Sequence, residues 1–387
     1  MVFIVTVLSF ILRLVAALLV FGIIVVIHEW GHFIVAKLMD VQVNEFSMGM
    51  GPKLLQWGKK ETKYTLRLFP IGGYCAMEGE DAAGGGEISV SEVPAEQAAD
   101  NPRAFNNKKV WRRTLIVVAG ATMNLILGFV LLLGYFGICT MPDDTTGKVY
   151  YAGTTIADLP ETALSYQSGL REGDALLKID GKRVFTVMDI QSLLQDSDDG
   201  TFEMVVRRVT DGKVEKVTLP AVSFQRDPLA DGGYRLIYDF KVNAIPQTIG
   251  STLSQSIKTE CSVAVMVWRS LGNLLTGRYG LNELSGPVGT VDIIGDVVAD
   301  AVEQQHWQDG LANVLMLIVL LTVNVGIFNL LPFPALDGGR LLFLIWEGIT
   351  RKPVPPKYEG WVHAVGMGLL LLLIVIVTFS DVFKLFA

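Results

Sequence analysis

Four long apolar stretches, separated by charged segments, constrain this chain more than any other feature. Residues 2–27, 114–142, 310–336 and 361–380 are each long enough to cross the hydrocarbon core of a bilayer, which takes about 20 apolar residues in a helix. Only 18% of the 387 residues are charged, whereas about a quarter is usual in soluble proteins. We therefore expect a polytopic α-helical membrane protein with four transmembrane helices.

The first apolar stretch has an alternative interpretation as a secretory signal peptide that is removed after export. It lacks a basic start and an Ala-x-Ala cleavage site, and it continues directly into His28 and Glu29. We therefore expect the mature chain to keep it.

The distribution of Lys and Arg predicts the orientation of the chain. Basic residues are concentrated in the segment between the first two stretches and in the short loop between the last two. Because basic loops stay in the cytosol, we place these two segments there and the long insert from about residue 143 to 309, with both termini, outside. The net charge of −7 gives no indication of nucleic-acid binding.

Two segments outside the apolar stretches are predicted to form β-structure. Alternating residues from Tyr64 onward, followed by Gly72 and Gly73, predict a hairpin over 64–78 in which the two glycines supply the tight turn. The insert has strand character and Asp-Gly turns typical of a small α+β domain. Its expected strands are 148–155, 174–179, 201–208 and 213–219, with turns at 180–181 and 211–212 and short helices at 164–170 and 188–194.

These patterns predict the following domain organisation. The order is a first transmembrane helix with a metal motif (1–40), a cytosolic segment (41–110) containing the hairpin and a flexible acidic loop (79–102), a second transmembrane helix (111–142), an extracytosolic domain (143–245), an amphipathic helical linker (246–309), a third transmembrane helix (310–340) and a fourth (361–380).

The end of the first apolar stretch carries the sharpest chemical signal, His28-Glu29-Trp30-Gly31-His32. On a helix, residues four apart share a face, so both imidazoles can reach one zinc ion. Glu29 lies beside them and can act as the general base for a zinc-activated water. The alternative, two unrelated histidines at a helix end, leaves polar groups at an apolar helix without a partner, which is costly.

Two histidines do not complete a catalytic zinc site, which usually has three protein ligands. Asp337 is the best third candidate, because a carboxylate closing an uncharged stretch among prolines and glycines marks a functional site. Alternatively, Asp337 only caps the third span near the headgroups. For His306 and His363, both isolated in sequence, we favour structural or surface roles.

Asn329 is polar and lies within the third span, eight residues before Asp337. It is a candidate to hold a substrate carbonyl or to support the oxyanion, and hydrogen bonding between helices is nearly as good an explanation. Cys75, Cys139 and Cys261 are scattered and predict neither a metal site nor a disulfide.

These motifs together resemble the site-2 protease family of intramembrane zinc metalloproteases. The chain is similar to the bacterial RseP-like branch in particular, but with a single PDZ-like unit in the insert. The segments that carry the resemblance are His28-Glu29-x-x-His32, Asn329-x-x-Pro332-x-x-x-x-Asp337-Gly338, Gly49–Pro52, Phe69–Tyr74, Gly286–Gly289, and Ser168-Gly169-Leu170-x-x-Gly173-Asp174 within the insert.

The resemblance implies an enzyme of the bacterial cytoplasmic membrane with zinc bound by His28, His32 and Asp337 and with Glu29 as the base. Its substrates would be single-span membrane proteins already trimmed by another protease, such as an anti-sigma factor or signal peptide remnants. The hairpin would dip into the bilayer and present the substrate as an extended strand along Gly72, Gly73, Tyr74, Cys75, Ala76 and Met77.

Two other functions remain as alternatives. A membrane-tethered peptidase that cleaves soluble segments at the surface would need an exposed zinc site, which the position of Asp337 within the third span disfavours. A scaffold or ion carrier with structural zinc would not need Glu29.

Overall fold

The structure is a computed structural model that describes residues 2–58, 61–80, 101–140, 146–195, 200–228, 234–277, 280, 285–304 and 306–386. The chain divides into two compact units. The helical unit comprises residues 1–131 and 270–387, and the sheet unit comprises residues 132–269.

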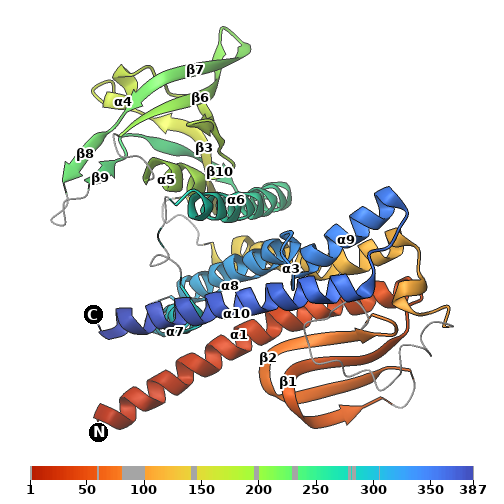
Figure 1. Ribbon diagram of the computed structural model, residues 1–387. Helices are drawn as coiled ribbons and strands as arrows, with labels where there is room; N and C mark the ends of the chain where they lie inside the picture. The colour runs from red at the N-terminus through yellow and green to blue at the C-terminus, as the bar shows by residue number, and fades with distance from the viewer. Residues whose placement is uncertain are drawn as a thin grey trace. The chain divides into compact units, whose positions relative to one another are not determined.

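The helical unit is built around long apolar helices (Figure 1). Its helices are α1 (Val2–Leu38), α3 (Val110–Gly134, which continues into the sheet unit), α7 (Pro287–Glu303), α8 (Trp307–Leu330), α9 (Asp337–Thr350) and α10 (Pro356–Phe386). Among the described residues, four helical segments are long and apolar enough to cross a membrane: Ile11–Leu38, Val110–Cys139, Trp307–Leu330 and Lys357–Lys384. They correspond to the four spans predicted from the sequence.

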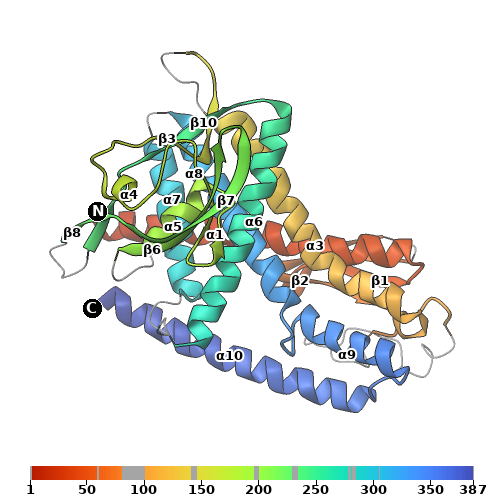
Figure 2. The same ribbon diagram turned by 90° about the horizontal axis from the view of Figure 1, so that it is seen from above.

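The region around Asp337 differs from the prediction of a third helix over 310–340. Helix α8 ends at Leu330, and Asp337 instead begins α9, a helix in the segment that was predicted to be a short loop. Figure 2 shows α9 and α10 as two separate helices joined by a turn. Pro332 and Pro334 explain the break, because proline lacks an amide donor and disfavours helical backbone in the residue before it.

Two long strands lie beside α1, β1 (Val43–Trp57) and β2 (Lys63–Met77) (Figure 1). The first part of β1, residues 43–48, pairs with residues 73–77 of β2, and residues 53–57 pair with residues 64–67. Residues 45–48 also pair with residues 63–66, so this part of β1 has neighbours on both sides. Residues 73–77 pair only with β1 among the described residues and therefore form an edge of the sheet.

The chain reverses direction close to the predicted turn at Gly72 and Gly73. Residues 63–66 and 73–76 lie on opposite sides of residues 45–48 and run in opposite directions, so the reversal lies between Leu66 and Gly73. Gly72 lies in this stretch and has a φ of +81°, a value that favours glycine. The two arms of the predicted hairpin are not direct neighbours, because residues 45–48 lie between them. The acidic loop predicted over 79–102 falls mostly on residues 81–100, which lie outside the described residues.

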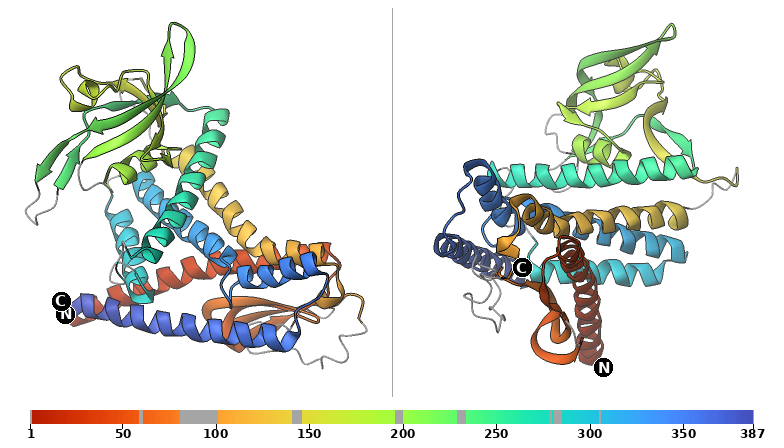
Figure 3. Two further views of the ribbon diagram at one scale, coloured as in Figure 1. Left: turned by 45° about the horizontal axis from the view of Figure 1, so that its top comes forward. Right: turned by 90° about the vertical axis from the view of Figure 1, so that its right-hand side faces the viewer.

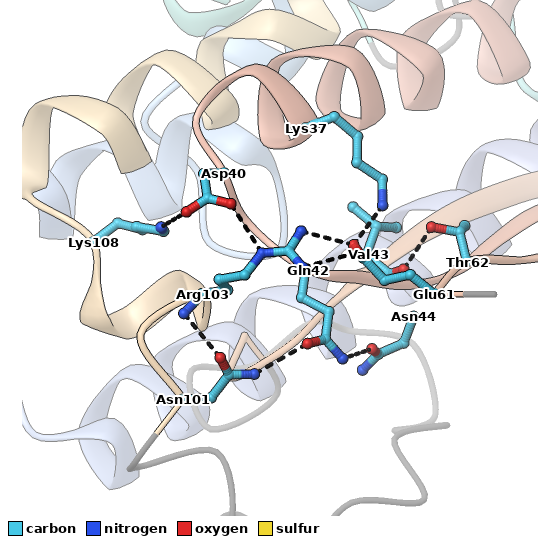
Figure 4. A network of polar contacts seen from close by, with 10 residues as sticks. All are labelled: Lys37, Asp40, Gln42, Val43, Asn44, Glu61, Thr62, Asn101, Arg103 and Lys108. Carbon is cyan, nitrogen blue, oxygen red and sulfur yellow. Dashed lines mark hydrogen bonds and ion pairs between the residues drawn. The ribbon is translucent and has the colours of Figure 1, made fainter.

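A network of charged side chains joins three segments near the end of α1 (Figure 4). Arg103 donates to Asp40 Oδ1 at 2.9 Å and to the two carboxylate oxygens of Glu61 at 2.8 and 3.0 Å. Lys37 donates to Glu61 at 2.6 Å, and Lys108 donates to Asp40 at 3.2 Å. These contacts tie the β1–β2 connection and the segment before α3 to the end of α1.

The network predicts a pH-dependent contribution to stability. Hydrogen bonds from Arg103 and Lys37 lower the pKa of Glu61 to about 2. Because the folded pKa is depressed, the ionised Glu61 stabilises the fold above its unfolded pKa, and this contribution is lost as the pH falls toward 2. We expect Glu61→Gln to lower the melting temperature slightly near pH 7, since the pair is partly exposed, and less at about pH 3. An equal difference at both pH values would contradict this account.

The sheet unit consists of a sheet with the strand order β10-β3-β4-β6-β7, in which β5 also pairs with β4. Its long β6–β7 hairpin is visible in Figure 3. The elements are β3 (Tyr150–Asp158), α4 (Leu164–Gln167), β4 (Ala175–Ile179), β5 (Lys182–Arg183), α5 (Val187–Gln195), β6 (Thr201–Thr210), β7 (Lys213–Ser223), the separate pair β8 (Gln225–Pro228) and β9 (Tyr234–Ile237), β10 (Lys241–Pro246) and α6 (Ile249–Leu275).

The four predicted strands of the insert correspond to β3, β4, β6 and β7, and both predicted Asp-Gly turns have the positive φ values that such turns require. A core of apolar side chains lies under the sheet, including Leu176, Phe202 and Met204. Two carboxylates of this unit, Asp174 and Asp189, are 0% exposed. Asp174 forms a two-point ion pair with Arg208, and Asp189 accepts a hydrogen bond of 2.6 Å from Ser262 on α6.

Candidate metal centre

Three of the predicted site residues meet in the helical unit. His28 and His32 lie one turn apart on α1, and Asp337 is the first residue of α9. Asp337 Oδ2 lies 3.0 Å from His28 Nε2 and 3.2 Å from His32 Nε2, and the two ring nitrogens are 3.2 Å apart. Among the described residues, this is the one group of three or more His, Cys, Asp or Glu side chains close enough to share a metal ion.

The start of α9 reaches the two histidines because it folds back against the end of α8. A Cβ at Gly338 would lie 2.0 Å from the Leu331 carbonyl oxygen, so only glycine permits this approach. The side chain of Asp337 is 16% exposed and those of His28 and His32 are 8% and 10% exposed. Burial raises the pKa of the Asp337 carboxyl, but His32 and His28 outweigh this effect and hold the pKa well below its usual range. The carboxylate is therefore ionised, which is the form that binds metal.

Helix α3 passes close to the two histidines at residue 120, which has no side chain. A Cβ at Gly120 on α3 would lie 2.3 Å from His32 Nε2 and 2.6 Å from His28 Nε2. Two imidazole nitrogens and one carboxylate oxygen form a ligand set typical of catalytic zinc, which leaves a fourth position for water or substrate. The residues present therefore fit a zinc ion.

This geometry predicts that Gly120→Ala impairs zinc binding. The new methyl group would occupy the space next to both ring nitrogens, so we expect zinc affinity to fall at least about 10-fold, as measured by competition with a chelator. Gly134→Ala is the matched control, because Gly134 lies on the same helix and has open space around its Cβ position. Equal zinc affinity in the two variants would contradict the assignment of this space to the ion.

Both histidines are oriented through their other ring nitrogen. His32 Nδ1 donates to the Ile116 carbonyl oxygen at 2.8 Å. His28 Nδ1 lies 3.3 Å from the side-chain amide of Asn124, which is fully buried on α3. The structure places Asn124 Nδ2 at this position. When Nε2 faces a metal, Nδ1 carries the ring proton, and an Asn124 amide turned by 180° would accept it with its oxygen. That oxygen has no other partner among the described residues, which agrees with this role.

Asn124 and Gly120 are not among the site residues that the sequence predicts. The sequence signal for Asn124 is its polar side chain within an uncharged span, because an amide buried in a membrane usually forms a hydrogen bond with a neighbouring group. No comparable signal exists for Gly120, since glycine is common in transmembrane helices and its importance depends on what lies opposite.

The catalytic candidate Glu29 follows His28 on α1 and lies against β2. A Cβ at Gly73 would lie 3.4 Å from Glu29 Cγ and 2.9 Å from the Ser47 carbonyl oxygen. Arg340, three residues after Asp337, forms an ion pair with Glu80, which follows β2. The edge segment 73–77 therefore passes beside Glu29, and its end is tied to the helix that carries Asp337.

The remaining candidates lie outside the cluster. Asn329 is half-buried in the last turn of α8, and its side chain makes no hydrogen bond to another described residue. His306 is exposed at the start of α8. His363 is 2% exposed, and its Nδ1 accepts a hydrogen bond from the backbone of Ala335. Neither histidine contributes to the metal cluster, as expected from the sequence.

A comparison with protein families matches residues 16–373 to the model of peptidase family M50. The chain belongs to this family. It is a zinc metalloprotease of the site-2 type and a membrane protein, in agreement with the sequence analysis. A putative zinc metalloprotease of Clostridium acetobutylicum is 33% identical over 96% of this chain and 97% of its own length. The regulator of sigma-W protease RasP of Bacillus subtilis is 28% identical over 97% of this chain and 100% of its own length.

Proposed function

We propose that this chain is an intramembrane endopeptidase in which His28, His32 and Asp337 hold the catalytic zinc and Glu29 is the general base. The observation that supports this most is the meeting of the three side chains on α1 and α9. Both histidines lie inside the membrane-spanning candidate Ile11–Leu38, so the bond to be cleaved must come to the level of the bilayer.

Each side chain has a distinct role in the proposed reaction. When bound, zinc would act as a Lewis acid that lowers the pKa of a bound water to about 7 and polarises a carbonyl group. Glu29 takes a proton from the attacking water and delivers it to the leaving amine. His28 and His32 keep their ring orientation through Asn124 and Ile116. Asn329 is proposed to hold a substrate carbonyl from the last turn of α8, where it has no competing hydrogen bond among the described residues.

The substrates are proposed to be single-span membrane proteins already trimmed by another protease. In a transmembrane helix the peptide carbonyls are engaged in hydrogen bonds, so the substrate must unwind before attack. The edge segment 73–77 offers unpaired backbone groups beside Glu29 and can bind an unwound segment by strand addition. The similarity to RasP, which is named as a regulator of sigma-W, favours an anti-sigma factor among the substrate classes.

We further propose that the chain lies in the bacterial cytoplasmic membrane with both termini outside, as its Lys and Arg distribution predicts. Residues 143–245, which lie in the sheet unit, are proposed to form a single extracytosolic PDZ-like domain that selects substrates or partners. Its strand β10 pairs only with β3 among the described residues and so presents an edge for peptide binding.

Mapping the cleaved bond tests the proposed function. The purified enzyme is reconstituted in liposomes with a single-span substrate, and the products are identified by mass spectrometry. We expect cleavage within the transmembrane segment or next to it, absent in Glu29→Gln. Cleavage restricted to soluble segments would support a surface peptidase, and no cleavage of any substrate by a zinc-loaded protein would support a non-catalytic role.

The edge segment gives a separate prediction. Ala76→Pro removes a backbone donor from this edge, so we expect cleavage of stable helical substrates to slow several-fold with unchanged zinc content. Substrates with Gly or Pro near the cleaved bond are already partly unwound and should be affected less. Gln56→Pro is the matched control, because it places proline in residues 53–57, which pair with residues 64–67. Equal losses for both substrate classes, or for both variants, would contradict a role in unwinding.

A further inference from the structure

The loop that carries Asp337 to the metal centre has an unusual backbone. Ala335 has a φ of +78°, in the left-handed region that favours glycine. The loop also contains Pro332 and Pro334, which cannot donate backbone hydrogen bonds. A non-glycine residue in this conformation persists only where its surroundings hold it there.

One side chain from a different helix holds this loop. The Ala335 amide donates a hydrogen bond of 2.9 Å to Nδ1 of His363, which lies on α10. His363 is 2% exposed, so the hydrogen bond is shielded from water. Without it the Ala335 amide would lose its partner, which is unfavourable for a buried backbone group.

The packing around His363 keeps α10 close to the loop. A Cβ at Gly366, three residues further on α10, would lie 2.4 Å from Pro334 Cβ and 2.7 Å from the Pro334 carbonyl oxygen. The ring of Phe343 on α9 lies with its centroid 5.7 Å from that of His363. Helix α10 therefore contacts the loop before Asp337 as well as the helix that follows it.

The hydrogen bond also determines which ring nitrogen of His363 carries the proton. Because Nδ1 accepts, the ring is neutral and the proton is on Nε2. Nε2 lies 4.0 Å from Glu359 Oε1 on the preceding turn of α10 and has no closer partner among the described residues. His363 thus faces the Asp337 loop with its only acceptor atom and cannot also ligate the ion through it.

We propose that His363 is a positioning residue for zinc binding, which holds the Ala335 backbone so that Asp337 meets His28 and His32. The inference rests on the proposed role of Asp337 as a zinc ligand. A carboxylate that is free to rotate away from the two histidines binds the ion more weakly. Residues that hold metal ligands in place therefore contribute to metal affinity without touching the ion.

The test measures zinc affinity of the full-length protein in detergent by competition with a chelator. His363→Leu removes the acceptor and should weaken zinc binding about 10- to 100-fold. His363→Asn places an amide oxygen near the position of Nδ1 and should restore most of the affinity. His363→Gln extends its oxygen one bond further and should not. His306→Leu is the matched control, because His306 is exposed and outside the loop.

The visible absorption of the Co²⁺-substituted protein provides a second readout. It reports the geometry of the ligands directly, so His363→Leu should change the spectrum and His363→Asn should not. If His363→Leu does not fold, the comparison of His363→Asn with His363→Gln still tests whether the acceptor atom supports zinc binding. Equal affinities and spectra for Asn and Gln, or an unchanged affinity in His363→Leu, would overturn the inference.

A double-mutant cycle separates the inference from the ligand assignment. Asp337→Ala should weaken zinc binding, and adding His363→Leu should then have no further effect, because His363 acts through Asp337. An additive loss would overturn the positioning role while leaving Asp337 as a ligand. An unchanged affinity in Asp337→Ala would overturn the ligand assignment and the inference with it.

Discussion

Glu29→Gln is expected to abolish most of the proteolytic activity while leaving zinc bound. The substitution keeps the size of the side chain but removes its ability to take a proton from water, and general bases typically contribute about 10²- to 10⁴-fold to a rate. Glu29 is not one of the three side chains that are close enough to share a metal ion, so the zinc content should match that of the wild type. The measurement combines turnover of a single-span substrate in liposomes with metal analysis of the same sample.

The control for this prediction is Glu161→Gln, because Glu161 is an exposed carboxylate of the sheet unit. It should leave both turnover and zinc content unchanged. A Glu29→Gln protein that still cleaves at the wild-type rate would contradict the assignment of the base. Loss of zinc together with turnover would show that Glu29 supports the metal as well.

His32→Ala and Asp337→Ala are each expected to lose zinc and activity together. Each removes one of three ligand atoms that lie within 4.8 Å of one another, and two remaining ligands bind zinc much more weakly. We expect the affinity to fall by at least about 100-fold, because even residues that only support ligands contribute 10- to 100-fold. Asp337→Glu should retain part of the affinity in a poorer geometry.

The matched control for the histidine is His306→Ala, which changes an exposed residue outside the cluster. Its zinc affinity should equal that of the wild type. Full zinc affinity in Asp337→Ala would mean that the third ligand lies elsewhere. Unfolding of the variants would be recognised by the melting temperature, and Asp337→Glu would then provide the test.

The histidine part of the site follows from the sequence because its geometry is local. His28 and His32 are four residues apart, so any helix brings them to the same face. The four spans follow from length and apolar composition for the same reason. Asp337 is recognisable in the sequence only by its charge in an apolar context, because its closeness to the histidines depends on where α9 begins relative to α1.

The parts that were not predicted depend on contacts between distant segments. The 14-residue helix α9 lies in a segment for which the sequence predicts a loop, because the segment is shorter than a membrane span and follows two prolines. Gly120 matters only because two ring nitrogens lie opposite it. The strand β1 and its pairing with β2 escaped prediction because Gly49, Gly51 and Pro52 interrupt its pattern, and such residues usually mark turns.

Cys75 is a possible alternative zinc ligand, because it lies in the edge segment 73–77 that passes beside Glu29. Its thiol is buried, but the side chains close enough to share a metal ion among the described residues are those of His28, His32 and Asp337. We therefore expect no sulfur next to the metal.

X-ray absorption at the zinc edge tests the central claim most directly, because it identifies the atoms bound to the ion. The measurement compares zinc-loaded wild-type protein with Asp337→Ala. The account predicts a spectrum with two imidazole ligands and oxygen in the wild type, and a loss of zinc or of one oxygen ligand in Asp337→Ala. A sulfur ligand, a third imidazole, or identical spectra with full zinc occupancy in the two proteins would contradict a centre built from His28, His32 and Asp337.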